Sequence, residues 1–438
     1  MFRKTLAYCY RQIFNRKILD VVKNLKKSDI LATDENLAIQ IKSLKKVLQN
    51  AASNIPYYSL EFNLDLDNLT YDNFRKLPIL TKAIIRENSG ELLNSAYKNI
   101  DTAVKNTSGG STGEPVEFYR TEEQAVHGMA NYYYALYLNK VDIFDCSVDL
   151  WGAERDMYGG SKFNFKFFLQ NKYMLNTFVL SDAIIKEYVD RLNRIKPKFI
   201  KAYVHSIYDM ARYINRNNIK INFAPVIHCT TGPLYPEMRD EIKRAFNQAH
   251  VYNFYGSREV SAIATEASGH DGMNVLFDNV FVEILDDNDE PVGIGQEGNI
   301  VITTLNNDYM PLIRYKIGDR GIKGDDVAFG TLKLTKVVGR TLGVIYKKNG
   351  TKLDGQFFTT LFFNKKGIKN FQLIQETLNK LTVNIVKTEL YDEDELNKIL
   401  ERINIELGTD VDVDLHFVPK IDLTSTGKIM YVYSKLDK

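Results

Sequence analysis

The stretch Asn106–Thr–Ser–Gly–Gly–Ser–Thr–Gly–Glu–Pro115 is the most informative part of the chain. Its seven residues from Thr107 to Gly113 comprise three glycines, two threonines and two serines. Glycines let a backbone approach a ligand closely, consecutive amides form an anion-binding nest, and hydroxyls supply further donors. Taken alone, the segment fits a phosphate-binding loop and a flexible surface loop about equally well. It is not a Walker A loop, because no Lys-Ser or Lys-Thr pair follows a glycine at the required spacing.

Around this stretch, from residue 104 to residue 330, short strand-like segments alternate with helical ones. The clearest run is FIKAYVH, SIYDMARYINRN, APVIHCT, PEMRDEIKRAF and HVYNFYG. This order is typical of a parallel or mixed sheet with helices on its faces. After residue 275 the pattern becomes hairpin-like. We therefore predict an α/β fold, with a large domain over 1–339 that includes mixed sheets and a β-rich subregion, and a small mobile α+β domain over 340–438.

Residues 1–55 show apolar residues at three- and four-residue spacing, which predicts helices that end at Pro56. A further helix is expected after Pro78, with Thr81 as its N-cap. The first 17 residues are basic and partly amphipathic. A solvated helical face is the commoner explanation, and a peripheral contact with a membrane surface is the alternative.

Length and composition exclude several classes of protein. The chain has 438 residues, which suggests two domains, and a net charge of +2, which argues against a general nucleic-acid binder. Its three cysteines, Cys9, Cys146 and Cys229, form no CxxC pair, so we expect neither a disulfide scaffold nor a zinc cluster. No apolar run reaches the length of a membrane span, and a reducing cytoplasmic location fits.

Gly293–Ile–Gly–Gln–Glu–Gly298 matches the dinucleotide-binding pattern GxGxxG in letters only. The segment precedes the strand-like NIVITTL, whereas that motif needs a helix N-terminus to face a pyrophosphate. We interpret it as a hairpin turn.

Four further segments carry residue types that an ATP site needs. They are Asn253–Phe–Tyr–Gly–Ser–Arg–Glu259, Arg314–Tyr–Lys–Ile–Gly–Asp319, Gly339–Arg340 and Thr424–Ser–Thr–Gly–Lys428. A glutamate at a strand end can hold Mg²⁺, a tyrosine can lie against an adenine, and a carboxylate after a glycine turn can accept bonds from ribose hydroxyls. Each segment alone also fits a structural role, such as a turn, a surface ion pair or a helix cap.

Together with the glycine-rich stretch, and in this order, these segments resemble the adenylate-forming superfamily of acyl-CoA synthetases and ligases. More closely, the chain resembles the phenylacetate-CoA ligase branch, including CapK-type and coenzyme F390 synthetase-like members. The resemblance covers nearly the whole chain: AASNIPYYS and LPILTKAIIREN look like the entry region of that branch, and TTGPLYPEMRDEI, YNFYGSREV and TTLNNDYMPLIRYKIGDRG look like its later motifs.

The resemblance implies ATP-dependent activation of a carboxylic acid as an acyl-adenylate, with release of pyrophosphate and transfer to a thiol of CoA or a carrier protein. It implies ATP, Mg²⁺ and CoA as cofactors and, through the CapK-type relatives, a context of capsule or surface polysaccharide biosynthesis. Carried over by motif, the phosphate-binding residues are Thr107, Ser108, Gly109, Gly110, Ser111, Thr112 and Gly113. The other nucleotide-binding residues are Gly232, Tyr255, Gly256, Ser257 and Asp319. The catalytic residues are Lys428, Arg340 and Glu259, the last of which would also bind the metal.

The chain departs from that pattern in ways that keep other functions open. No lysine follows Pro115, Arg258 occupies a position that is usually small or hydroxylic, and Thr–Leu–Gly follows Arg340 where many relatives have an acidic or lysine hinge residue. Gly232 stands where many relatives have glutamate. The alternatives are nucleotidyl transfer without a thioester, acyl transfer to a sugar amine, and a non-catalytic nucleotide-binding role.

The acid itself is not identified by the sequence. Segments expected near the acyl pocket are Trp151–Gly–Ala, Ala202–Tyr203–Val–His205 and Cys229–Thr–Thr–Gly232, with Tyr203, Thr231 and Gly232 as candidate lining residues. The histidines are not at paired ligand spacing, so His205, His228, His250 and His270 are interpreted as pocket or surface residues.

Overall fold

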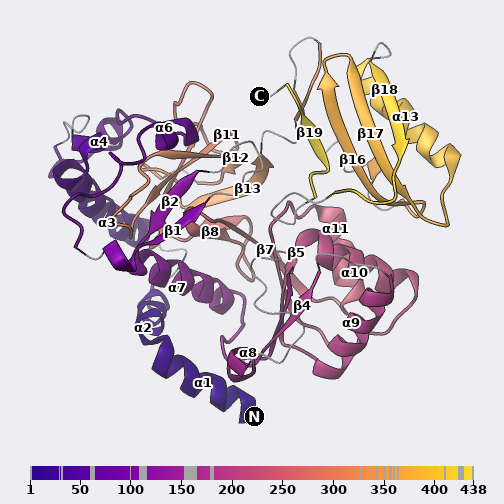
Figure 1. Ribbon diagram of the computed structural model, residues 1–438, viewed down its shortest axis with the longest axis horizontal. Coiled ribbons are helices and arrows are strands. Elements are labelled where there is room, and N and C mark those ends of the chain that lie inside the picture. The colour runs from indigo at the N-terminus through magenta and orange to yellow at the C-terminus, as the bar shows by residue number, and fades with distance from the viewer. Residues whose placement is uncertain are drawn as a thin grey trace.

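The structure is a computed structural model in which one long mixed sheet carries the larger part of the chain and a smaller sheet carries the C-terminal part (Figure 1). It describes residues 2–28, 30, 33–59, 65–98, 100–107, 116–151, 165–177, 182–325, 327–340, 344–348, 352–354, 358, 361–362, 365–408, 411–422 and 429–436.

Eleven strands form the long sheet in the order β10-β11-β12-β13-β9-β8-β7-β6-β5-β3-β4. The five strands at one end, β7-β6-β5-β3-β4, are parallel, and β7 joins them to an antiparallel half through β8. The parallel half consists of β3 (Ser147–Trp151), β4 (Lys172–Asn176), β5 (Phe199–Tyr203), β6 (Val226–Thr230) and β7 (His250–Ser257). The antiparallel half consists of β8 (Ser261–Thr265), β9 (Met273–Val275), β10 (Val280–Leu285), β11 (Glu297–Thr304), β12 (Tyr315–Lys323) and β13 (Lys333–Arg340). This mixed sheet confirms the predicted α/β fold.

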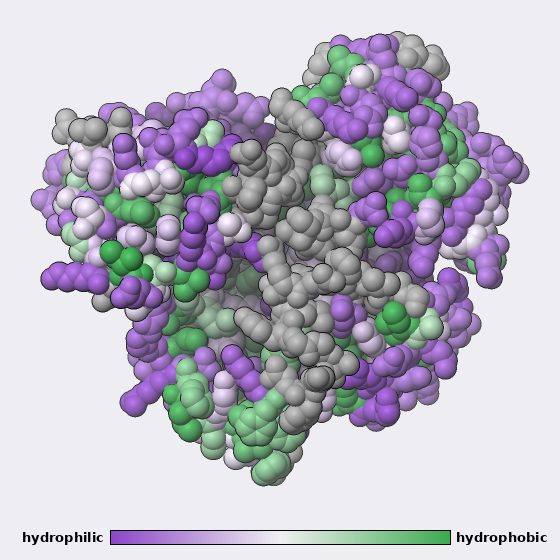
Figure 2. Space-filling model, in the orientation of Figure 1, coloured by the Kyte–Doolittle hydropathy of each residue, from purple (hydrophilic) through white to green (hydrophobic). Residues whose placement is uncertain are grey.

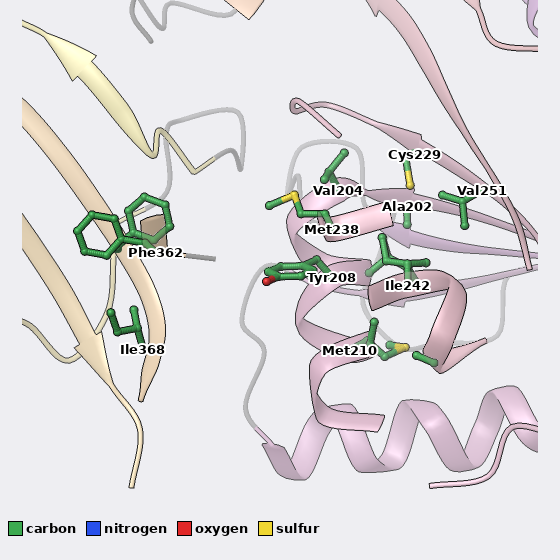
Figure 3. Packing of buried hydrophobic residues seen from close by; sticks show 14 of the residues in the cluster. Ala202, Val204, Tyr208, Met210, Cys229, Met238, Ile242, Val251, Phe362 and Ile368 are labelled. Carbon is green, nitrogen blue, oxygen red and sulfur yellow. The ribbon is translucent and has the colours of Figure 1, made fainter. Parts of the chain in front are cut away.

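The parallel half packs its outer face against α9 (Asp182–Ile195), α10 (Val204–Arg216) and α11 (Pro236–Ala245). Ala202, Cys229 and Val251 point from three neighbouring strands toward Ile242 of α11 (Figure 3). Each of these side chains is at least 97% buried. Burying a valine or isoleucine side chain contributes roughly 1.5–3 kcal/mol, so this layer fixes the outer face of the sheet and leaves the opposite face for other contacts.

Helices precede the sheet in the chain, as predicted for residues 1–55. They are α1 (Phe2–Phe14), α2 (Arg16–Leu25), α3 (Thr33–Asn54), α4 (Pro56–Ser59), α5 (Tyr71–Phe74) and α6 (Lys82–Glu87). Thr81 is the N-cap of α6, as expected, since its hydroxyl accepts a bond from the Ile84 amide at 3.3 Å. A two-stranded ribbon, β1 (Val104–Thr107) with β2 (Glu117–Arg120), leads into α7 (Glu122–Leu138); the 3-10 turn η1 (Ile100–Thr102) and helix α8 (Phe165–Leu169) complete this part.

The pattern GxGxxG lies in the connection between the antiparallel strands β10 and β11, which confirms the hairpin interpretation. Gly295 takes a left-handed φ of 76° there, and a Cβ on Gly298, in β11, would lie 2.5 Å from the Leu285 carbonyl oxygen of β10, so only glycine fits. No helix begins at this segment, so it presents no helix N-terminus to a pyrophosphate.

The face of the molecule shown in Figure 2 is mostly hydrophilic, but apolar side chains gather at the end where α1 lies. Phe2, Ile13 and Phe14 of α1 and Phe165 of α8 are each more than 60% exposed. Among the described helices, none is both long and apolar enough to cross a membrane. A peripheral membrane contact through residues 1–17 stays a prediction.

The C-terminal part of the chain has its own four-stranded sheet in the order β18-β17-β16-β19. Its elements are β16 (Ile368–Thr377), β17 (Lys380–Lys387), α13 (Glu393–Leu407), β18 (Asp412–Phe417) and β19 (Val432–Ser434), with a ribbon of β14 (Val344–Tyr346) and β15 (Lys352–Asp354) beside them. This is the expected α+β arrangement. The division between residues 339 and 340, and the mobility of this part, remain predictions.

The two sheets are joined by contacts at α10. Arg212 of α10 donates hydrogen bonds at 2.7 Å to the backbone carbonyls of Ile368 and Lys369 at the start of β16. Tyr208 and Asp209, on the preceding turn of α10, face Tyr431 beside β19. The contact between the two parts of the chain therefore contains an acidic and a basic group from the same helix.

Asp209 gives this contact a pH dependence. Burial raises the pKa of its carboxyl to about 6, against the opposing influence of Arg212 and Lys369. Because the pKa of this carboxyl is higher in the folded than in the unfolded state, the protonated Asp209 stabilises the fold fully below about pH 4. This stabilisation is lost as the pH rises through about 6. Asp209→Asn is therefore expected to melt at a higher temperature than the wild type at pH 7.5, with a difference that shrinks toward pH 5. Equal differences at both pH values, measured by differential scanning calorimetry, would contradict this expectation.

Candidate active site

A cavity of about 1100 Å³ lies on the inner face of the long sheet, where the parallel and antiparallel halves meet. Its walls come from α1 and α7, from strands β1 to β8, β12 and β13, and from residues 429–432 of the C-terminal part. The cavity is large enough for a nucleotide together with an acid, since pockets for single small ligands are usually about 300–1000 Å³.

Six of the residues proposed from the sequence line this cavity together. They are Gly232, Tyr255, Gly256, Ser257, Glu259 and Asp319. Arg340 is placed by its backbone alone: its position at the end of β13 is directly opposite Asp319 in the β12–β13 register. The sheet thus gathers motifs that are more than 80 residues apart in the chain.

The remaining proposed residues either lie outside the cavity lining or fall outside the described residues. Thr107 ends β1, is exposed and is not among the lining residues, although its neighbour Asn106 is. Residues 108–113 and Lys428 lie outside the described residues. The chain directly after Lys428, from Ile429 to Val432, does line the cavity.

Tyr255 and Asp319 meet across the sheet. The Tyr255 hydroxyl donates to Oδ2 of Asp319 at 2.8 Å, which orients a carboxylate that follows the left-handed Gly318 (φ 88°). A Cβ on the adjacent Gly256 would lie 2.6 Å from the Ser261 carbonyl oxygen, so only glycine fits where β7 bulges against β8. These contacts hold an aromatic ring and an acceptor at fixed positions on the cavity wall.

Glu259 lies in the turn between β7 and β8 with only 7% of its surface exposed. Its backbone carbonyl accepts a bond from Gln124 Nε2 at 3.3 Å, and its carboxylate lies 3.5 Å from the Tyr315 hydroxyl, a distance that makes any hydrogen bond weak. No group of three or more His, Cys, Asp or Glu residues that could hold a metal occurs among the residues that the structure describes. A single carboxylate suits Mg²⁺ that is held largely by phosphates and water.

Two arginines on this wall were missed as ligands by sequence reasoning. Arg120, at the end of β2, donates to the Ser261 hydroxyl at 3.2 Å and lines the cavity with Arg258. Burial, and secondarily the charge of Arg258, lower the pKa of the Arg120 guanidinium. Two guanidinium groups beside Ser257 favour phosphate at this end of the cavity. The sequence offered a signal only for Arg258, which lies within the motif Asn253–Glu259; Arg120 follows the glycine-rich stretch by five residues and belongs to no motif.

The far end of the cavity contains the three candidate lining residues that the sequence named for the acyl pocket. Trp151, Tyr203, Thr231 and Gly232 line the cavity, and the rings of Trp151 and Tyr203 lie 4.4 Å apart. Ala202 and Cys229 do not, because alternate residues of a strand face opposite sides and these two face the helices (Figure 3).

His205 is not among the lining residues either. It lies in the first turn of α10 with 8% of its surface exposed, and burial lowers its pKa to about 4. A neutral, buried histidine at a helix start is adequately explained as a packing residue, so its predicted place near the acyl pocket is not supported.

Comparison with known proteins agrees with this architecture. The family model of the CapK C-terminal domain matches residues 345–435. Over its length the chain is 24% identical to Protein CapK of Staphylococcus aureus, in an alignment that covers 97% of this chain and 94% of that protein.

Solved structures of ligases share the fold. A 2-hydroxyisobutyryl-CoA ligase in the postadenylation state, in complex with R3-HIB-AMP, is 17% identical, with a TM-score of 0.71 over 93% of this chain and 90% of that one. The same ligase in the thioesterification state, with 2-HIB-AMP and CoA, is 17% identical, with a TM-score of 0.57 over 92% and 90%. An anthranilate CoA ligase in complex with anthranoyl-AMP is 14% identical, with a TM-score of 0.56 over 74% and 64%.

The protein therefore has the fold of the AMP-forming acyl-CoA ligases. Its C-terminal part matches the CapK C-terminal domain, and the whole chain is similar to Protein CapK, in agreement with the resemblance to CapK-type proteins found in the sequence.

Proposed function

We propose that the protein activates a carboxylic acid with ATP and transfers the acyl group to a thiol of CoA or a carrier protein. The observation that carries the proposal is the gathering of Tyr255, Gly256, Ser257, Glu259 and Asp319 on one cavity wall. These residues come from two segments of the chain and are the types that an adenylate site needs. The fold shared with AMP-forming ligases supports the same reaction.

In the first step an oxygen of the acid's carboxylate attacks the α-phosphorus of ATP. The bond between that phosphorus and the α–β bridging oxygen breaks, and pyrophosphate leaves with the electron pair. Both reactants are anions, so the protein must position them and stabilise the charge. In the second step the thiol sulfur attacks the acyl carbon, AMP leaves, and the thiol proton is lost to solvent.

Each proposed residue has one task in this scheme. Tyr255 and Gly256 border the adenine, and Asp319 accepts bonds from the ribose hydroxyls. Ser257, with Arg120 and Arg258, faces the phosphates. Glu259 would hold Mg²⁺, which when bound neutralises phosphate charge. The residues from Thr107 to Gly113 would bind the β- and γ-phosphates, Gly232 would face the nucleotide, and Lys428 and Arg340 would approach the reacting phosphate.

The test is ATP–pyrophosphate exchange with Mg²⁺ across a panel of aryl, fatty, hydroxy and amino acids. Exchange is expected with one class of acid and should disappear without acid or without Mg²⁺. Glu259→Gln, which keeps the size of the side chain but removes the charge, is expected to slow exchange by about tenfold or more; Glu237→Gln, on α11, is the matched control. ATP binding with no exchange for any acid would contradict the proposal.

The acceptor is tested with the acid that this panel identifies. CoA is expected to consume the adenylate and give a thioester, whereas a sugar amine would give an amide. The resemblance of the motifs to CapK-type proteins is the basis for proposing a role in capsule or surface polysaccharide biosynthesis, which fits either acceptor. If only the amide forms, the acceptor is an amine and not a thiol, and the first step of the proposal is unchanged.

A further inference from the structure

Arg212 of α10 holds the start of β16 through backbone carbonyls. Its Nη1 donates to the carbonyl of Lys369 at 2.7 Å, and its Nη2 donates to the carbonyls of Ile368 and Lys365 at 2.7 and 3.3 Å. The register of β16 with β17 shifts between Ile368 and Asn370, so Lys369 is the extra residue of a bulge. Because a guanidinium carries its donors in a fixed fork, the three bonds hold this part of β16 against α10 in one orientation.

The strand anchored in this way also carries the C-terminal wall of the cavity, residues 429–432. β19 pairs with β16 in parallel. The amide of Leu373 donates to the carbonyl of Tyr431 at 2.7 Å, and Nε2 of Gln372 donates to the carbonyl of Met430 at 3.0 Å. The anchored carbonyls and the residues that support this wall therefore belong to the same strand.

At its other end, α10 is continuous with the opposite wall of the cavity. Tyr203, the last residue of β5, lines the cavity, and Val204 begins the helix. Arg212 lies roughly 12 Å further along the helix axis, at 1.5 Å per residue. Between these two ends, Tyr208 belongs to one apolar cluster with Phe362 of the C-terminal part (Figure 3). A single helix thus connects the cavity wall formed by the long sheet to the anchor of the smaller sheet.

The apolar cluster and the bonds of Arg212 contribute differently to this junction. Hydrophobic burial holds two surfaces together but is non-directional. Hydrogen bonds from a charged donor are stronger than neutral ones, and they weaken steeply when the angle at the hydrogen changes. Because all three acceptors are backbone carbonyls, Arg212 fixes the path of the chain itself.

We propose that Arg212 is a positioning residue for adenylate formation, which fixes β16 and, through β19, holds residues 429–432 against the cavity. This inference rests on the proposed function, in which Lys428, directly before this wall in the sequence, stabilises charge on the reacting phosphate. Arg212 is not one of the cavity-lining residues. Its effect on the reaction therefore passes through the C-terminal part of the chain.

The test is a double-variant cycle in ATP–pyrophosphate exchange, with the acid that the panel identifies. Arg212→Ala is expected to lower kcat by about tenfold or more with little change in KM, because a small misplacement of a catalytic group has a large effect on rate. In a Lys428→Ala background the same substitution is expected to change kcat by less than about twofold, since the group that it positions is gone. A merely structural role of Arg212 would lower kcat by the same factor in both backgrounds.

Arg216→Ala is the matched control. Arg216 is on the next turn of α10, and its guanidinium pairs at 2.6 Å with Asp182 of α9, within the same part of the chain, so kcat should be unchanged. Arg212→Lys keeps the charge but not the fork of donors and is expected to recover only part of the rate. If thermal unfolding shows that Arg212→Ala does not fold, the cycle is run with Arg212→Lys instead.

Three results would overturn the inference. An equal fall of kcat in both backgrounds, or a wild-type rate for Arg212→Ala, would show that Arg212 does not position this wall, and the proposed function would stand. A wild-type rate for Lys428→Ala would remove the group through which Arg212 acts. If no acid supports exchange in the wild type, the proposed function fails and the inference fails with it.

Discussion

Replacement of Glu283 by alanine is expected to destabilise the protein by about 3–5 kcal/mol, because it leaves a buried guanidinium without its counter-charge. Glu283 and Arg314 have side-chain exposures of 0% and 2%, and two hydrogen bonds of 3.0 and 3.1 Å join them. Arg314 also donates to the backbone carbonyls of Leu77 and Arg75. The pair thereby ties the segment before α6 to strands β10 and β12.

The measurement is the thermal midpoint, with a double variant as the decisive comparison. Arg314→Met combined with Glu283→Leu removes both charges and is expected to lie closer to the wild type than Glu283→Ala does. Asp287→Asn breaks an ion pair with Arg320 at a site where the aspartate is 65% exposed, so it should cost less than about 1 kcal/mol. If the thermal midpoint of Glu283→Ala falls no further below the wild type than that of Asp287→Asn, the buried pair is not required for stability.

Arg314 also shows how far the sequence could predict the site. The segment from Arg314 to Asp319 was identified by its motif, and Asp319 does line the cavity. That Arg314 itself is a buried anchor depends on the register of β10, β11 and β12, which brings Glu283, 31 residues away, within hydrogen-bonding distance of it across β11. Local patterns predict strands, whereas strand partners are decided by packing of the whole sheet.

The sequence also did not predict which face of the parallel strands lines the cavity. Strands buried on both sides read as nearly continuous apolar runs, so alternation does not say which face meets the ligand. Of the segments expected near the pocket, Tyr203, Thr231 and Gly232 line the cavity, whereas Ala202 and Cys229 face the helices; Lys201 and His228, which the sequence did not single out as lining residues, also line it. The presence of β5 and β6 was predictable; the direction of their side chains required the positions of α10 and α11.

Removal of the Lys428 side chain is expected to reduce adenylate formation by about a hundredfold or more, as for other groups that stabilise charge only in a transition state. The lysine belongs to the polar segment Thr424–Ser–Thr–Gly–Lys428, and the residues that follow it, Ile429 to Val432, line the cavity. A compact ammonium on a long side chain is suited to reach the α-phosphate from there. Because the effect acts on the rate of the chemical step, kcat for ATP–pyrophosphate exchange should fall while ATP binding persists.

Lys420→Ala is the matched control for this variant. Lys420 is on the same approach to the C-terminus, with a side chain that is 80% exposed and 3.5 Å from Asp422, so its removal should leave exchange unchanged. Lys428→Arg is expected to recover only part of the rate, because a planar guanidinium keeps the charge but not the shape of an ammonium. If Lys428→Ala exchanged as fast as wild type, or Lys420→Ala fell equally far, the catalytic role would not belong to Lys428, and the charge on the reacting phosphate would have to be stabilised by Arg120, Arg258 or Arg340 instead.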